Sequence, residues 1–257
     1  MKKLSIFGIF VSVLLIALCI TPFVYVLFRS IVTADRTVTF SYYYEVFLAN
    51  QEYLFRFWRS LFLTLCITAG QTTVSILAGY GFAKSNFPGK NILFFLLMAL
   101  MIMPLQVTLV PNYTILDKMG LLDTYYALAL PAIFVPLGTF IMTQSFKAIP
   151  NEIIEASRVD GCNTMGALLQ IGIPATRTGI ICTLLLSFLD GWNLVEQPMV
   201  YLRKFMDFPI SVALASIPSG DPTLQLVCCL LVVIPPLFLF VFFNRELAEG
   251  VAMGKEK

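Results

Sequence analysis

The side chains best suited to hold a polar solute lie in two short stretches, residues 112–113 and 190–197. A polar solute can be bound by aromatic stacking together with amide and carboxylate hydrogen bonds. The candidate pathway residues that offer such groups are Asn112, Tyr113, Asp190, Trp192, Asn193 and Gln197. An ionisable residue within an apolar span is a functional candidate by default, which singles out Asp190. The alternative is that Asp190 reaches the membrane interface, where Trp192 would also be stable.

Several other kinds of chemistry are disfavoured by what the sequence lacks. The chain has no histidine and a net charge of only +2, so neither a histidine metal or proton-relay site nor a nucleic-acid surface is expected. The six cysteines fall in apolar stretches or beside the polar segment near residue 160, which favours buried small side chains over disulfides or zinc ligands. No G-x-x-x-x-G-K-S/T phosphate loop occurs, so ATP hydrolysis by this chain is not expected. We assign no catalytic residue, metal site or cofactor to it.

The composition predicts an all-α membrane protein that positions these residues on spanning helices. Of the 257 residues, 58 % are hydrophobic and 12 % are charged, and a spanning helix needs about 20 apolar residues. Six runs satisfy that length within one domain of residues 1–257, at 4–28, 60–82, 92–110, 125–146, 178–195 and 224–243. The first run is too long for a signal peptide and is expected to stay as an anchor. Pro104 and Pro111 should kink or end the third span.

The placement of lysine and arginine predicts the orientation of the chain. If both termini are cytoplasmic, that side carries ten of these residues and the other side carries seven. Acidic residues show the opposite distribution, with six inside and eight outside. We therefore expect both termini, and the polar loop at residues 150–174, to be cytoplasmic.

This loop is predicted to form two short helices joined by a glycine turn. Asn151 is expected to cap the first helix, and Gly161 to end it in the left-handed conformation. Asn163 or Thr164 can cap a second helix over 165–171, and Pro174 is expected to begin the fifth span. Small, apolar and charged side chains on the first helix suit a groove on a partner protein, with Ile153, Ile154 and Val159 as its apolar contacts. The alternative is an amphipathic linker resting on lipid headgroups.

The spacing within this loop resembles the EAA loop of the permease subunits of ABC importers. That pattern is E-A-A, three residues, G, nine residues, then I-x-L-P, and this chain keeps every interval, with Ser157 in place of the second alanine and Ile173 in place of leucine. The resemblance implies a coupling helix that docks on a cytoplasmic ATPase subunit, with ATP and Mg held by the partner. The residues implied in ATPase coupling are Glu152, Glu155, Ala156, Ser157, Arg158, Asp160, Gly161, Ile171 and Pro174.

Further segments are similar to carbohydrate permeases of the maltose-system type. They are "AGYGFAKSNFPGKN", "MIMPLQVTLVPNY", "GWNLVEQPMVYL" and the tail "NRELAEGVAMGKEK". This resemblance implies a second permease subunit, two ATP-binding subunits and an extracytoplasmic solute-binding protein, in the plasma (inner) membrane of a bacterium or archaeon. The alternatives are an importer of a polyamine, phosphate ester or peptide, an ion-coupled secondary transporter, and an integral membrane enzyme.

Overall fold

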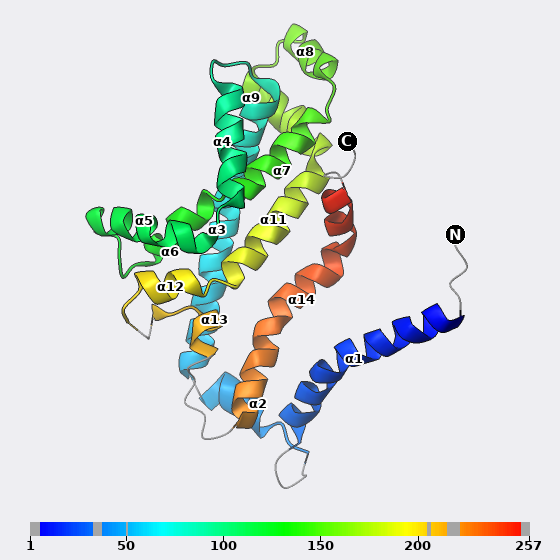
Figure 1. Ribbon diagram of the computed structural model, residues 1–257, viewed down its shortest axis with the longest axis vertical. Coiled ribbons are helices and arrows are strands. Elements are labelled where there is room, and N and C mark those ends of the chain that lie inside the picture. The colour runs from blue at the N-terminus through cyan, green and yellow to red at the C-terminus, as the bar shows by residue number, and fades with distance from the viewer. Residues whose placement is uncertain (1–5, 33–37, 50, 205–206, 215–221, 253–257) are drawn as a thin grey trace.

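The computed structural model describes residues 6–32, 38–49, 51–204, 207–214 and 222–252 as a helical protein (Figure 1). The helices, in chain order, are α1 (Ile6–Ile31), α2 (Ser41–Tyr44), η1 (Glu45–Ala49), α3 (Gln51–Lys84), α4 (Lys90–Ile102), α5 (Leu105–Lys118), α6 (Tyr125–Ile133), α7 (Pro136–Lys147), α8 (Asn151–Val159), α9 (Thr164–Ala167), η2 (Leu168–Gly172), α10 (Ile173–Ala175), α11 (Arg177–Trp192), α12 (Glu196–Tyr201), α13 (Ile210–Ala213) and α14 (Pro222–Ala252). Within these ranges the β-structure is confined to an isolated bridge between Val32 and Val38. The prediction of an all-α protein is confirmed.

Helix α3 is the central element of the fold. Its 34 residues extend for about 50 Å at the α-helical rise, well beyond the thickness of a hydrocarbon core. It contributes Tyr53, Ile67 and Tyr80 to three separate buried clusters along its length. Helices α7 and α11 pack closely along it, because glycines at the contacts leave room for neighbouring side chains. A Cβ built on Gly79, for example, would lie 2.6 Å from the Cβ of Met142.

The predicted third span, 92–110, is divided between two helices, and the chain bends by 109° from the first to the second. The break follows from Pro104: Met103 before it is extended at φ −71° and ψ 128°, as a residue preceding proline prefers to be. Helix α4 has only 13 residues, or about 20 Å, which is too short to cross the hydrocarbon core alone. The predicted break at Pro104 is confirmed, whereas Pro111 lies inside α5 and does not end it.

The other predicted spans correspond to helices with somewhat different bounds. Four segments are long and apolar enough to cross a membrane, at 11–31, 52–84, 125–147 and 225–244, and up to six cross if each of the two sharply bent helix pairs counts as one span. The span predicted at 125–146 is interrupted between α6 and α7, where Val135 is extended before Pro136. The span predicted at 178–195 ends earlier, at Trp192. Residues 4 and 5 of the first span lie outside the described residues.

Helix α1 extends away from the rest of the protein and makes its main contacts with α14 (Figure 1). The apolar window within its span at 11–31 contains no buried residue. Exposing this much apolar surface to water would be unfavourable, whereas lipid tails accommodate it without cost. This feature is consistent with the predicted membrane location.

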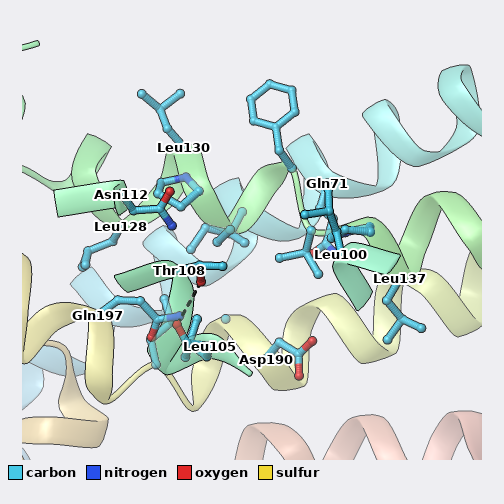
Figure 2. Close-up of a pocket in the computed structure, with 18 of the residues that line it drawn as sticks. Gln71, Leu100, Leu105, Thr108, Asn112, Leu128, Leu130, Leu137, Asp190 and Gln197 are labelled. Carbon is cyan, nitrogen blue, oxygen red and sulfur yellow. Dashed lines mark hydrogen bonds between the residues drawn. The ribbon is translucent and has the colours of Figure 1, made fainter. Parts of the chain in front are cut away.

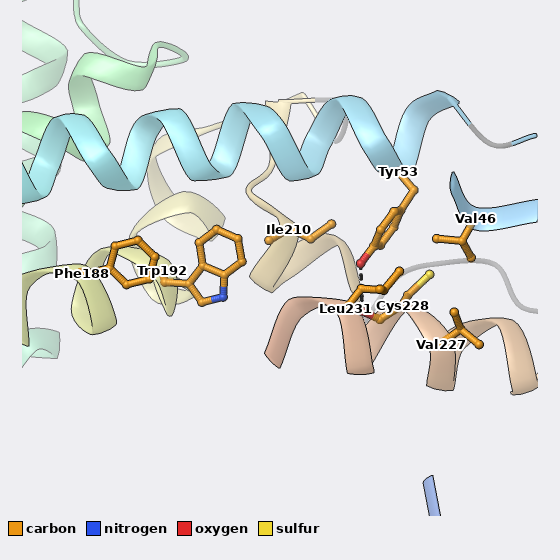
Figure 3. Packing of buried hydrophobic residues seen from close by; sticks show 8 residues of the cluster. All are labelled: Val46, Tyr53, Phe188, Trp192, Ile210, Val227, Cys228 and Leu231. Carbon is orange, nitrogen blue, oxygen red and sulfur yellow. Dashed lines mark hydrogen bonds between the residues drawn. The ribbon is translucent and has the colours of Figure 1, made fainter. Parts of the chain in front are cut away.

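Helix α14 is held to the body of the protein by polar groups that reach its backbone (Figure 3). Pro236 has no N–H, so the carbonyl of Val232 four residues earlier lacks its usual helical partner. The indole N–H of Trp192 donates to this carbonyl at 3.1 Å, and the hydroxyl of Tyr53 donates to the carbonyl of Cys228 at 2.9 Å. Trp192 therefore connects the end of α11 to the proline-containing part of α14.

Candidate functional site

Helix α8 stands at one end of the molecule, beyond the ends of α3 and α7 (Figure 1). Pro150 is its N-cap, and Asn151 is its first helical residue. The prediction that Asn151 caps the helix is therefore wrong, because its side chain binds Lys84 and not the N–H groups of the first turn. The side-chain oxygen of Asn151 instead accepts a hydrogen bond from the ammonium of Lys84 at 2.8 Å.

The turn after α8 is a Schellman motif centred on a left-handed glycine. Gly161 has φ +88°, as predicted from the sequence. Its N–H donates to the carbonyl of Arg158 at 3.1 Å, and the N–H of Cys162 donates to the carbonyl of Ser157 at 2.9 Å. These two bonds satisfy carbonyls that the helix end leaves free, and they fix the direction in which the chain leaves α8.

The helix that follows begins at a side-chain cap. The carboxamide oxygen of Asn163 accepts from the N–H of Gly166 at 2.7 Å, which confirms the predicted cap. The second helix then continues from α9 through the π-helical segment η2 into α10. Pro174 lies in α10, and the chain bends by 81° before α11 begins at Arg177. The prediction that Pro174 itself begins the fifth span is therefore wrong.

The two faces of α8 have different surroundings. Ile154 and Ser157, three residues apart, face inward, and Ile154 is only 3 % exposed in a cluster with residues of α3, α7 and η2. The remaining residues of α8 are exposed, and Val159 reaches 88 %. The expected apolar contacts of a partner are thus reduced to Ile153 and Val159, because Ile154 packs into this chain's own core.

The other predicted coupling residues surround this exposed face. The exposed ones are Glu152, Glu155, Ala156, Arg158, Asp160, Gly161 and Pro174. Ile171 is half-buried, and the hydroxyl of the buried Ser157 donates to the carbonyl of Ile154 at 2.8 Å. A helix anchored on one face and free on the other presents a rigid surface, with two carboxylates and one guanidinium, to another molecule.

Lys84 is expected to fix α8 to the end of α3. Its ammonium donates both to the carbonyl of Ile149 and to the side chain of Asn151. In Lys84→Met the alkyl stem is kept and both bonds are lost, so amide exchange across 151–159 should accelerate by about tenfold. Hydrogen exchange measured by mass spectrometry tests this, with Lys90→Met as a control because the hydrogen bond described for Lys90 stays within its own turn, at the carbonyl of Ser85. Unchanged protection of α8 in Lys84→Met would contradict the assignment.

A second candidate site is a cavity of about 970 Å³ between α3, α4, α5, α6, α7, α11 and α12 (Figure 2). Its walls are mainly leucine, isoleucine, methionine and proline, with a few polar side chains among them. Four of the six predicted pathway residues line it: Asn112, Asp190, Asn193 and Gln197. The bend at Pro104 makes this possible, because it turns α5 away from α4 and brings Asn112 to the same cavity as α11 and α12.

The structure does not bring the two predicted aromatic residues to this cavity. Trp192 is 2 % exposed and packs against Phe188 and Phe57 in the core. Tyr113 packs against the cluster that joins α3, α5, α6 and α12, and it hydrogen-bonds Arg203. The physical reason for both is that an amphipathic ring gains more from packing with its polar atom paired than from lining an open cavity.

Sequence reasoning missed two further polar groups in the wall of the cavity. Gln71 on α3 is buried and accepts a hydrogen bond from the hydroxyl of Ser187 on α11. Thr108 on α5 lines the cavity and donates to the carbonyl of Leu105 at 2.9 Å. A glutamine within the second predicted span was an available signal, because an amide is costly to bury without a partner.

Two ion pairs connect the segment after α12 to α3 and to the loop before α6. The guanidinium of Arg203 lies 3.8 Å from the carboxylate of Asp123, whose backbone has a positive φ of 60°. The hydrogen bond that the guanidinium of Arg203 donates to the hydroxyl oxygen of Tyr113, together with the charge of Asp123, raises the pKa of Arg203 further, so it stays charged at all physiological pH values. Arg59 pairs with Asp207 at 3.1 Å. Within the described residues, no group of three or more His, Cys, Asp or Glu side chains is placed to hold a metal ion.

Comparison with known proteins places the chain among transport components. Residues 46–248 match the family described as binding-protein-dependent transport system inner membrane component. The chain is 28 % identical over 224 residues to the arabinooligosaccharides transport system permease protein AraQ of Halalkalibacterium halodurans, which covers 86 % of this chain and 80 % of that protein. It is 30 % identical over 200 residues to the sn-glycerol-3-phosphate transport system permease protein UgpE of Yersinia pestis, with 75 % and 70 % covered.

The fold is also found in a solved structure. A chain in the crystal structure of a bacterial ABC transporter involved in the import of the acidic polysaccharide alginate superposes with a TM-score of 0.83. The two chains are 20 % identical, and the match covers 95 % of this chain and 98 % of that chain. At this level of identity the similarity establishes the fold.

Proposed function

The chain belongs to the family of binding-protein-dependent transport system inner membrane components, and from that premise we propose that it forms half of the pathway of an ATP-driven sugar importer. A second permease subunit would form the other half, and a solute-binding protein would deliver the sugar from outside. Two ATP-binding subunits with their ATP and Mg would bind at the cytoplasmic end. This assignment makes both termini cytoplasmic, as the distribution of lysine and arginine favours.

The observation that best supports this proposal is that α8 is anchored to the protein on one face and exposed on the other. Ile154 and the Lys84 bonds anchor the helix, so a force on Glu155 or Val159 acts on α3 and α7 as well. The Schellman turn at Gly161 directs the chain into α9, η2 and α10, which lead to α11. In the proposed mechanism, closure of the ATPase pair moves α8, and the motion reaches α3, α7 and α11, which border the cavity.

The cavity is where we place the solute. A volume of about 970 Å³ lies at the upper end of the range found for small-molecule sites, and the amides of Asn112, Asn193 and Gln197 can hydrogen-bond sugar hydroxyls. The relatives are named for arabinooligosaccharides and sn-glycerol-3-phosphate, so a carbohydrate or a close derivative of one is the class that they support. Residues from the partner permease would complete the binding surface.

Reconstitution tests the proposed function. The chain would be co-expressed with the products of its neighbouring genes, purified, and placed in vesicles with ATP enclosed and the binding protein outside. We expect uptake of a labelled oligosaccharide that requires both ATP and the binding protein. Purification of the chain alone, or uptake that follows an ion gradient without ATP, would overturn the proposal in favour of a secondary transporter.

A further inference from the structure

The polar groups that line the cavity are almost all uncharged. Five of them are neutral, and they are Gln71, Thr108, Asn112, Asn193 and Gln197. Asp190 is the one charged residue among the described residues of the lining, which include neither lysine nor arginine. Figure 2 shows it on α11, and its side chain is exposed rather than buried in the wall. The fixed charge that this chain presents to the cavity is therefore negative.

The arginines of neighbouring segments are already paired. Arg59 is bound to Asp207 and lies over the ring of Tyr125, with 5.1 Å from its guanidinium carbon to the ring centroid. Arg203 pairs with Asp123. A carboxylate near the cavity adds to the negative potential: Glu196 on α12 precedes the lining residue Gln197 and accepts hydrogen bonds from Gln106 at 2.9 and 3.1 Å. Gln106 is neutral, so these two hydrogen bonds bring no positive charge to the carboxylate.

An anion that approaches Asp190 is repelled more strongly than it would be in water, because apolar walls lower the effective dielectric constant. A sugar hydroxyl has no such penalty, and it can donate a hydrogen bond to the same carboxylate. We propose that Asp190 makes this half of the pathway selective by charge, so that it takes uncharged or amino sugars and rejects phosphate esters and uronates. The proposal rests on the proposed function for its biological meaning, but the charge effect itself does not require transport.

Charged thiol reagents measure the effect without the binding protein. Asn193, three residues after Asp190 and on the same cavity, would be replaced by cysteine as the reporter. The background would carry alanine at the four native cysteines that are not buried, Cys19, Cys66, Cys162 and Cys229. The assembled, purified complex would be reacted with a cationic reagent (trimethylammonium-ethyl methanethiosulfonate) and an anionic one (sulfonatoethyl methanethiosulfonate), and the ratio of the two rates recorded.

We expect the cationic reagent to be favoured by about tenfold at Asn193→Cys, relative to an exposed cysteine at Asn86→Cys in the turn between α3 and α4. In Asp190→Asn this preference should fall toward one, while the ratio at Asn86→Cys stays the same. A preference that is absent, or that persists in Asp190→Asn, overturns the charge-selectivity proposal. Neither result depends on uptake, so the outcome is distinguishable from a failure of the complex to transport sugar with ATP.

Discussion

Gly161→Val should abolish most ATP-dependent uptake, with a loss of at least about tenfold, while the chain still inserts and binds the second permease. Gly161 has φ +88°, and a Cβ there would meet nothing within 4 Å. The penalty is therefore backbone strain rather than a clash, about 1–2 kcal/mol for an ordinary residue and more for a β-branched one. The turn would relax by giving up the two Schellman bonds, and α8 would then lose its fixed direction. Uptake by vesicles and ATPase stimulation by loaded binding protein measure the loss.

A matched control exists in the turn between α3 and α4. Gly89 also has a positive φ, +81°, and open space around its Cβ, so Gly89→Val imposes the same backbone strain away from α8. We expect it to lower thermal stability as Gly161→Val does but to leave coupling largely intact. Gly161→Asn should retain most activity, because asparagine tolerates the left-handed region. Equal loss of uptake in Gly89→Val and Gly161→Val would show that general destabilisation, and not the coupling turn, is responsible.

Trp192→Ala is expected to have the largest effect on stability, about 3–5 kcal/mol, because it removes a fully packed indole from the core where α3, α11 and α14 meet. Trp192→Phe keeps an aromatic ring and removes only the N–H, which leaves the Val232 carbonyl unpaired at a cost of about 1–3 kcal/mol. Thermal unfolding of the purified complex, followed by tryptophan fluorescence or calorimetry, should rank wild type above Trp192→Phe and Trp192→Phe above Trp192→Ala.

The second tryptophan of the chain provides the control. Trp58 is 59 % exposed on α3, and Trp58→Phe should change the midpoint of unfolding little. If Trp192→Phe were as stable as wild type, the indole bond would not secure α14 and the proline-freed carbonyl would have another donor. If Trp192→Ala lost only solute uptake and kept its stability, the original assignment of Trp192 to the pathway would be restored.

The helical class of the protein could be predicted because the length of an apolar run is a one-dimensional property. The positions at which the helices break were harder to predict, because the effect of a proline depends on its neighbours. Both Pro104 and Pro111 lack an N–H, yet only Pro104 ends a helix, since Met103 adopts the extended conformation and Val110 stays helical. The bend before α11 falls at Thr176, two residues after Pro174, and not at the proline itself. Such differences are decided by tertiary packing.

In the candidate sites, too, some features follow from local sequence and others depend on tertiary packing. Gly161 and Asn163 have conformations that local chemistry dictates, and both predictions are confirmed. The orientation of Ile154 toward the core and of Val159 toward the outside depends on where α7 and η2 lie, which local spacing does not reveal. Trp192 is the type of residue that commonly stacks on sugars. Its N–H instead donates to the carbonyl of Val232, which lacks a helical partner because of Pro236, more than forty residues later in the chain.

Site-specific photocrosslinking tests the central claim that α8 docks on an ATPase subunit. A photoreactive amino acid at Val159, 88 % exposed on α8, would be compared with one at Met119, 59 % exposed at the end of α5. In the co-expressed complex we predict a crosslink to the ATP-binding subunit from position 159 and none from position 119. The 159 crosslink should also change in yield when ATP is bound. If position 159 gives no crosslink to an ATP-binding subunit, or position 119 gives an equal one, α8 is not the coupling surface.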